Sequence, residues 1–258
     1  MVTRYLSALN PPKELLPGPD TGLSWNEAVL RLARYVSLIP YESDAAYFRG
    51  LSDLWCTSDQ FLHMVCGDEE EHAVLLACYL LHLEQLRQTT ESEEHTASPL
   101  QIYLCFGEAL PEGQTVYVLT GEEGPEMNKM STRWKLWNPL RGQSFSVNNA
   151  NGPMRSIWGL ANAHNVWANI QAKKQPWELD WDLTSRKSWL PFFPVRSKHS
   201  RGKRDPGGFE DRPPLATVQP AALIYEQLDS RELENIKFEL EAALRDALMV
   251  WRRNKVSP

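Results

Sequence analysis

The chain has 258 residues, of which 42% are hydrophobic and 23% are charged, and its formal net charge is −6 at pH 7. This composition predicts a globular protein with one sizeable core, and the acidic balance argues against nucleic-acid binding, because domains that bind phosphate backbones are normally basic. No apolar run approaches the roughly 18 residues that span a bilayer, and the N-terminus lacks a signal-peptide pattern, so we expect a cytoplasmic protein without a transmembrane segment.

The first 24 residues contain four prolines between positions 11 and 19, which predicts an extended lead-in, residues 1–24, that wraps the surface of the domain. Ser24 then has the features of an N-cap for a helix over 25–37, because Glu27 stands three residues later and completes a capping box. Two shorter helical turns are expected downstream, at 43–48 and 58–64.

The chain is organised around the segment that follows Gly67. The acids Asp68 to Glu71 suit the first turn of a helix, where carboxylates complement unsatisfied N–H groups and the helix dipole. Residues 73–83 are then almost wholly apolar, which predicts a central helix buried on most sides. Four consecutive acids point in different directions around a helix, so capping is favoured over a metal site, and we expect neither a metal nor a cofactor.

The polar segment at 87–98 predicts a mobile loop, after which the pattern changes to strands. Strands are expected at 100–106, 115–120, 133–137, 144–147, 156–160, 165–170 and 178–182. Their short, turn-rich connections favour antiparallel pairing, so the fold class is α+β. Several of the ten tryptophans fall within 134–189, which indicates an aromatic core or a groove lined with flat rings.

The C-terminal part of the chain predicts a second mobile loop and a last helix. Residues 196–214 combine basic side chains with glycine and proline pairs, which is typical of a poorly ordered insertion. Residues 230–253 carry apolar side chains at helical spacing and predict an amphipathic helix that packs on the domain. We therefore expect one domain over 25–258.

Three short segments resemble the catalytic motifs of the transglutaminase-like and papain-like superfamily, in which a helix-borne cysteine meets a histidine and an aspartate from successive strands. Gly67 to Ala73 resembles the start of the catalytic helix, Thr115 to Leu119 the strand that opens with the histidine, and Trp134 to Pro139 the next strand, which ends in aspartate-proline. The three catalytic positions hold Glu69, Thr115 and Asn138, so the resemblance implies the fold without the triad.

A closer resemblance covers nearly the whole chain. The phrases that carry it are Ala8-Leu9-Asn10-Pro11-Pro12, Ser37-Leu38-Ile39-Pro40-Tyr41, Asp53-Leu54-Trp55-Cys56-Thr57, Leu136-Trp137-Asn138-Pro139, Val166-Trp167-Ala168-Asn169-Ile170-Gln171 and Val218-Gln219-Pro220-Ala221. These look like the C-terminal region of the ciliary coiled-coil and C2 domain-containing protein 2 family. The resemblance implies a degenerate transglutaminase-like domain in a scaffold of the ciliary transition zone and basal body, with other transition-zone proteins as partners.

An active cysteine peptidase or transamidase is the alternative in which the chain keeps catalytic chemistry. Such an enzyme needs a thiolate with a base within about 3 Å, and Cys66 with His63 or His72 is the available pair. Against it, the four cysteines lie in or beside apolar runs without CxxC spacing, which indicates reduced, structural thiols.

A binding module that keeps the ancestral groove is the reading we favour. The predicted groove residues are Trp55, Tyr117, Arg133, Lys135, Trp137 and Arg141. Their aromatic and basic character suits an extended acidic peptide, and tubulin C-terminal tails are a candidate ligand. A purely structural scaffold domain, which holds partners through the last helix or the basic run at 196–204, is a further alternative.

Overall fold

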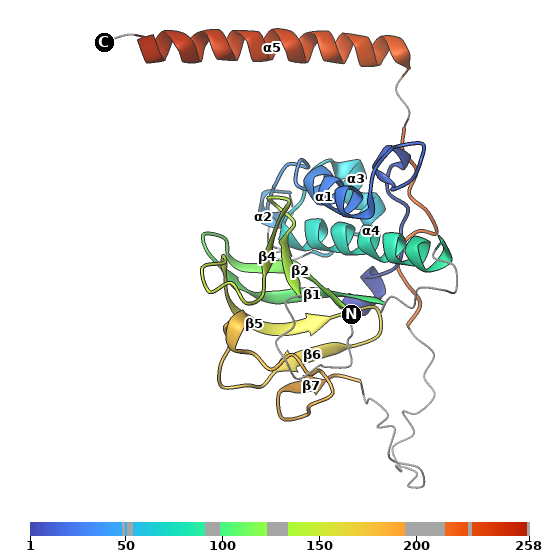
Figure 1. Cartoon of the computed structure of the whole chain (residues 1–258), viewed down its shortest axis with the longest axis vertical. Helices are drawn as coiled ribbons and strands as arrows, with labels where there is room; N and C mark the ends of the chain where they lie inside the picture. The colour runs from blue at the N-terminus through green and yellow to red at the C-terminus, as the bar shows by residue number, and fades with distance from the viewer. Residues whose placement is uncertain are drawn as a thin grey trace. The chain divides into compact units, whose positions relative to one another are not determined.

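Figure 1 shows the computed structural model of the chain, which describes residues 1–47, 50, 54–90, 99–122, 134–193, 215–226 and 229–256. The chain divides into two units, Met1–Leu223 and Ile224–Pro258. The lead-in belongs to the first unit and the last helix to the second. None of the described helices is long and apolar enough to cross a bilayer.

Two of the helices before the sheet begin with a capping box, of which the one at Ser24 was predicted. In α1, the Ser24 hydroxyl accepts from the Glu27 N–H while the Glu27 carboxylate accepts from the Ser24 N–H at 2.9 Å. Thr57 and Gln60 form a second capping box at the start of α3. The three helices span Trp25–Val36 (α1), Asp44–Tyr47 (α2) and Ser58–Met64 (α3). The expected helices at 25–37 and 58–64 are confirmed, since each has its cap encoded locally.

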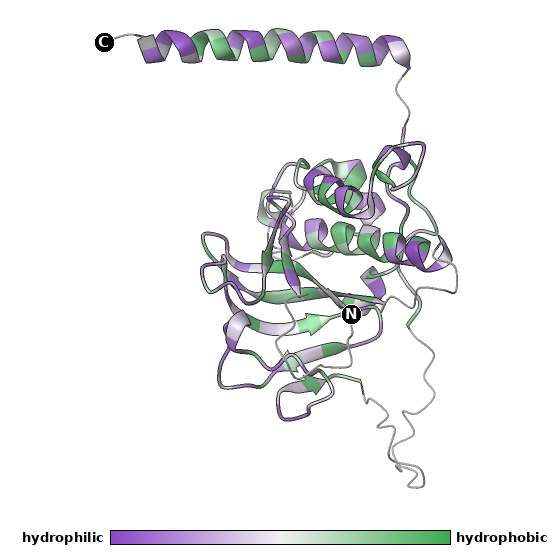
Figure 2. Ribbon diagram, viewed as in Figure 1, coloured by the Kyte–Doolittle hydropathy of each residue, from purple (hydrophilic) through white to green (hydrophobic). Residues whose placement is uncertain are grey.

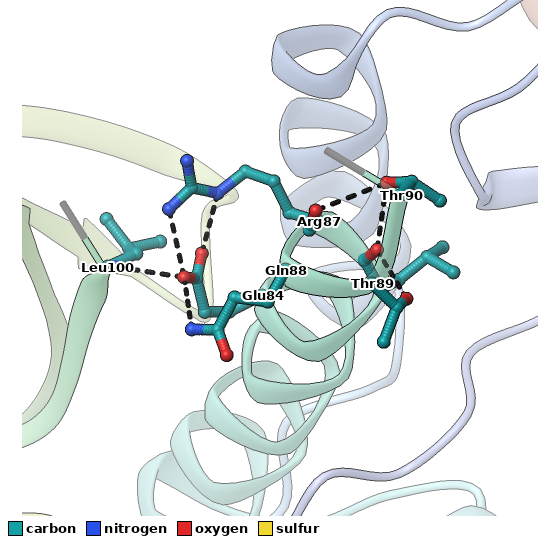
Figure 3. A network of polar contacts seen from close by, with 7 residues as sticks. Glu84, Arg87, Gln88, Thr89, Thr90 and Leu100 are labelled. Carbon is teal, nitrogen blue, oxygen red and sulfur yellow. Dashed lines mark hydrogen bonds and ion pairs between the residues drawn. The ribbon is translucent and has the colours of Figure 1, made fainter. Parts of the chain in front are cut away.

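Helix α4 spans Glu69–Thr90, is largely apolar in its middle after an acidic first turn, and extends beyond its predicted end (Figure 2). Two residues of the expected loop, Arg87 and Gln88, donate hydrogen bonds to the Glu84 carboxylate, the guanidinium at 2.9 Å and the amide at 2.8 Å. It also accepts from the Leu100 N–H at 3.1 Å, which ties the helix end to the first strand (Figure 3). Residues 87–90 of the predicted loop are therefore helical, and 91–98 lie outside the described residues.

The sheet has seven antiparallel strands in the order β4-β3-β2-β1-β5-β6-β7. Its strands are Leu100–Ala109 (β1), Gly113–Glu122 (β2), Lys135–Asn138 (β3), Gln143–Ser146 (β4), Met154–Ala161 (β5), Val166–Asn169 (β6) and Trp189–Pro191 (β7). The predicted antiparallel strands are confirmed except at 178–182, where proline begins the short 3-10 helix Pro176–Glu178 instead. Strand β7 was not expected, because three residues are too few to show a pattern.

The two faces of the sheet have different coverings. Helix α4 packs on one face, and the segment that carries β7 folds under the other (Figure 1). The second face holds an aromatic core. In it the Trp181 ring stacks on the Trp134 ring with their centroids 6.0 Å apart, and the centroids of Trp181 and Trp189 are 6.1 Å apart. The expected aromatic core within 134–189 is confirmed. Alternate residues of a strand face opposite sides of the sheet. The β2 and β3 side chains that alternate with those of the aromatic core therefore face α4.

The lead-in is packed against the central helix. It contains the 3-10 turns Val2–Tyr5 and Lys13–Leu15, and it buries Leu6 and Leu9. The Leu9 N–H donates to the Cys78 carbonyl of α4 at 3.2 Å. A C-terminal segment, residues 215–223, lies beside the lead-in, where the Val218 N–H donates to the Arg4 carbonyl at 3.0 Å. Both ends of the first unit are thus fastened to its core.

The second unit is built around α5, which spans Ser230–Val256. The expected helix at 230–253 is confirmed and extends three residues further. Apolar and polar residues alternate along it in bands (Figure 2). Every α5 side chain that the structure describes is exposed, including all the apolar ones.

Candidate functional site

The start of α4 is the place where the sequence predicts a site, and its acids form a closed cap. The Asp68 N–H donates to the Glu71 carboxylate at 3.2 Å, and the Asp68 carboxylate accepts from the Glu70 N–H at 3.3 Å. Glu71 also accepts from the Cys56 N–H at 3.1 Å, which joins the loop before α3 to the cap. The capping interpretation of this acidic run is confirmed.

His72 locks the same end of the helix from within. Its ring is fully buried, with Nδ1 at 2.6 Å from the Asp68 carbonyl oxygen and Nε2 at 3.0 Å from the Ile39 carbonyl oxygen. Both ring nitrogens of His72 thus lie within hydrogen-bond distance of backbone carbonyl oxygens. His72 therefore holds residues 39–42 against the helix and has no nitrogen turned toward a cysteine.

Residues 39–42 run beside the residues that begin α4. Tyr41 and Gly67 form a parallel bridge, in which the Gly67 N–H donates to the Pro40 carbonyl at 3.2 Å and the Glu42 N–H donates to the Gly67 carbonyl at 2.9 Å. The glycine is required here, since a Cβ on Gly67 would lie 2.8 Å from the Phe61 ring. This close approach brings the Tyr41 hydroxyl to the Glu69 carboxylate, to which it donates a hydrogen bond.

The acids at this site favour their neutral forms. Burial, followed by contact with Asp68, raises the pKa of Glu70 to about 9 and the pKa of Glu71 to about 8. Burial also raises the pKa of Glu69, and partial burial together with the Glu69 charge raises the pKa of Tyr41 to about 12. Glu70 and Glu71 therefore favour their protonated forms at neutral pH.

Three of these acids have the spacing of a cation site. One carboxylate oxygen from each of Asp44, Asp68 and Glu71 lies within 4.8 Å of the others. The Asp44 carboxylate accepts from the Leu54 N–H, and the other two acids take part in the cap. Protein groups thus already use all three acids, and shared protons reduce the negative charge that a cation would otherwise balance.

The cysteines nearest this helix end are held as neutral thiols or bonded to backbone. Burial and the Glu71 charge raise the pKa of Cys56 to about 11. The Cys66 thiol donates to the Met64 carbonyl at 3.4 Å, while Cys78 and Cys105 are fully buried. His63, the other histidine considered as a base, places Nδ1 at 2.8 Å from the Asp59 carbonyl of its own helix.

Thr115 and Asn138 do not meet Glu69. Thr115 shares its side of β2 with Tyr117, a member of the aromatic core, and Asn138 lies opposite Tyr117 and donates to its hydroxyl at 2.6 Å. Both side chains therefore face away from α4, and the residues beside them that face the helix are Val116 and Trp137. Neither valine nor tryptophan supplies a base or an orienting carboxylate.

The predicted groove residues are also distributed over both faces of the sheet. Tyr117 is buried on the aromatic side, where it lines a small pocket with Leu136 and Met154. Trp137 is buried on the helix side and donates to Thr120 at 2.9 Å. Trp55 lies further along that side, with its ring centroid 6.3 Å from that of Phe106.

The basic residues of the predicted groove are equally separated. Lys135 is exposed, Arg141 pairs with Glu112 at 3.1 Å, and Arg133 lies outside the described residues. The structure does not bring the predicted groove residues together into one surface.

A surface that sequence reasoning missed borders the acidic cap. Four apolar side chains are exposed there: Leu38 (61%), Tyr41 (53%), Met64 (40%) and Val65 (63%). Val65 has φ 59° and ψ 18°, a left-handed conformation that is rare for a β-branched residue. The sequence signals were the apolar residues at or just past the ends of α1 and α3, and the Tyr41–Gly67 bridge joins the two segments that follow these helices. We call these four residues the cap surface.

Comparisons with known proteins agree with this architecture. Residues 53–192 match the family model of the CEP76 peptidase-like domain. The chain is 29% identical to human protein CC2D2B over 253 residues, 98% of this chain, and 22% identical to Drosophila melanogaster coiled-coil and C2 domain-containing protein 2A over 241 residues, 93% of this chain. It spans about 15% of the length of each of these relatives.

Among solved structures, the chain is similar to Legionella pneumophila LapG. The EGTA-treated form is 14% identical, with a TM-score of 0.42 over 62% of this chain and 73% of that one. The calcium-bound form is 15% identical, with a TM-score of 0.41 over 66% and 80% of the two chains.

Proposed function

The chain belongs to the CEP76 peptidase-like domain family, and we propose that it is a catalytically inactive member that works as a protein-binding scaffold module of the ciliary transition zone and basal body. The observation that carries the proposal is the start of α4, where the resemblance implies a nucleophile and the chain has Glu69, a half-buried acid that accepts a hydrogen bond from Tyr41. A carboxylic acid in this setting is no substitute for a thiolate. The same helix end carries an exposed apolar surface, which is the property of a binding site.

We expect the 258-residue chain to show no peptidase or transamidase turnover, because its described cysteines and histidines form no nucleophile–base pair. An iodoacetamide-type probe should label Cys66 no faster than a thiol in an unfolded peptide, and Cys66→Ala should leave a fluorogenic peptide assay at background. Selective labelling of Cys66, together with turnover that this substitution abolishes, would instead establish the cysteine enzyme.

The chemistry of the cap surface defines the kind of partner that it fits. Leu38, Tyr41, Met64 and Val65 offer apolar contact, and Glu69 and Glu70 lie beside them with raised pKa values. A lysine or arginine from a partner would replace the protons that these acids hold. The favoured ligand is therefore a protein segment that combines apolar and basic side chains, such as a segment of another transition-zone protein.

Acidic tubulin tails remain the second candidate ligand. Their support is the exposed ammonium group of Lys135, because Arg141 is already paired with Glu112. An acidic tail at the cap surface would meet negative charge.

Val65→Asn is expected to stabilise the protein and weaken ligand binding. Asparagine tolerates the left-handed conformation, so the free energy of unfolding should rise by about 1 kcal/mol. Loss of the valine's apolar contact should weaken binding of a labelled peptide rich in lysine, arginine and leucine by about fivefold. Denaturant unfolding and fluorescence anisotropy measure the two effects, which have opposite signs because the strain is placed at the binding surface.

The matched control is Leu190→Asn, since Leu190 is 55% exposed on β7, away from the cap surface. This variant should bind the basic peptide as the parent does. A tubulin-tail peptide is measured in parallel. If it binds more tightly than the basic peptide and Lys135→Glu removes that binding, the cap surface is not the site.

A further inference from the structure

We propose that α5 pairs with α5 of a second copy of this chain in an antiparallel arrangement. The proposal is independent of the cap surface and concerns how the chain assembles. It starts from the apolar side chains that α5 leaves exposed and from the distribution of charge along the helix.

One face of α5 is continuously apolar. Residues at spacings of three, four and seven share a face of a helix, and those on this face are Leu233, Ile236, Leu240, Ala243, Leu244, Ala247 and Trp251. The larger ones are all exposed, with Leu244 at 63% and Leu240 at 58%. The helix is about 40 Å long, and an isolated helix of marginal stability gains most from covering such a face.

Charge is divided between the two halves of α5. The first half, to Ala243, contains four glutamates and two basic residues, whereas the second half contains one aspartate and four basic residues. On one flank of the apolar face, Glu234, Lys237 and Glu241 lie in the first half and Arg245, Arg252 and Lys255 in the second. Spacings of 3, 7, 11, 18 and 21 residues from Glu234 place the other five side chains within about 60° of it around the helix.

This charge pattern selects the partner and its direction. Two copies related by a two-fold axis across the helix place the Glu234 end of one against the Lys255 end of the other, so opposite charges meet on the flank twice. In a parallel pair this flank would instead meet the opposite flank of the second copy, which carries Glu232, Glu239, Asp246 and Arg253, so Glu234 and Glu241 would face mainly acids. The helix is therefore complementary to itself only when the second copy is reversed.

The test is self-association of the 258-residue chain, measured by sedimentation equilibrium. The chain is expected to dimerise, and Leu240→Glu with Leu244→Glu should make it monomeric. Glu234→Lys with Glu241→Lys should raise the dimer dissociation constant about tenfold or more, because like charges then meet along the flank. Adding Arg252→Glu and Lys255→Glu to that variant should restore the parental constant, since opposite charges again face each other.

A parallel dimer would respond differently, because Glu234 and Glu241 would face Glu239 and Asp246 of the second copy, so Glu234→Lys with Glu241→Lys would lower the dissociation constant. Phe238→Gln is the matched control, since Phe238 is exposed but lies on the opposite side of the helix, and it should leave association unaffected. Circular dichroism of each variant checks that α5 remains helical. The proposal is overturned if the chain stays monomeric at every concentration. It is also overturned if the dimer dissociation constant is unchanged by the leucine substitutions or by the flank substitutions.

Discussion

Gln219→Ala is expected to lower the free energy of unfolding of the first unit by about 2–4 kcal/mol, the largest effect of any single polar side chain considered. The Gln219 side chain is buried, accepts from the Ser58 N–H at 2.9 Å and donates to the Tyr5 carbonyl at 2.8 Å and to the Ser58 hydroxyl at 3.1 Å. Alanine would leave these buried groups without partners, at a cost of about 1–3 kcal/mol each before relaxation.

The effect is measured by denaturant unfolding followed by tryptophan fluorescence. Gln114→Ala is the control, because Gln114 is exposed on β2 and its removal should change the unfolding free energy by no more than about 0.5 kcal/mol. A loss below about 1 kcal/mol for Gln219→Ala would show that residues 215–223 contribute little to holding the lead-in and α3 together.

The second large effect is a fall in stability as pH rises. The folded-state pKa values of Glu70 and Glu71, about 9 and about 8, lie above the ordinary value of 4.5, so the folded protein holds protons that the unfolded chain has released. The stabilisation is therefore complete below about pH 4.5 and is lost as pH rises through 8 to 9. Between pH 5 and pH 9 we expect the unfolding free energy to fall, because the folded protein loses the protons of these two acids while the unfolded chain has few left to lose.

Glu71→Gln isolates this contribution. Glutamine keeps an acceptor for the Cys56 N–H and does not titrate, so the difference in unfolding free energy between pH 5 and pH 9 should shrink relative to the parent. Glu108→Gln, at an exposed position on β1, should leave the pH profile unchanged. A profile that stays the same in Glu71→Gln would mean that the buried cap does not titrate over this range.

Features encoded by neighbouring residues were predictable from the sequence. Ser24 with Glu27 marks a helix start, because both partners of the capping box lie within one turn. The apolar run after Glu71 marks a buried helix, because no amphipathic arrangement accommodates it. The strands around Leu104 and Val118 follow from β-branched and aromatic runs between turn residues.

The end of α4 was mispredicted for a related reason. Residues 85–90 have no apolar period, and their helical state depends on Glu84, whose carboxylate reaches Leu100 beyond the intervening loop. The local sequence around the end of α4 contains Glu84 but not Leu100, whose N–H holds the Glu84 carboxylate in place.

The candidate site shows the same division between local and distant information. The acidic cap could be predicted, because Asp68 to Glu71 satisfy N–H groups of their own helix. The relation between Glu69, Thr115 and Asn138 could not, because a strand's side chains alternate between faces and only the assembled core tells which face meets the helix.

The opening of α4 thus has two origins. By itself the sequence determined that a buried helix begins after Gly67 under a cluster of acids. Only the tertiary structure decided that both ring nitrogens of His72 lie against backbone carbonyl oxygens. It also decided that the side chains of Thr115 and Asn138 face away from α4, and that Tyr41 is bridged to Gly67 beside the acids. The physical reason is that capping acts within one turn, whereas burial, pairing across strands and shared protons depend on residues far apart in the chain.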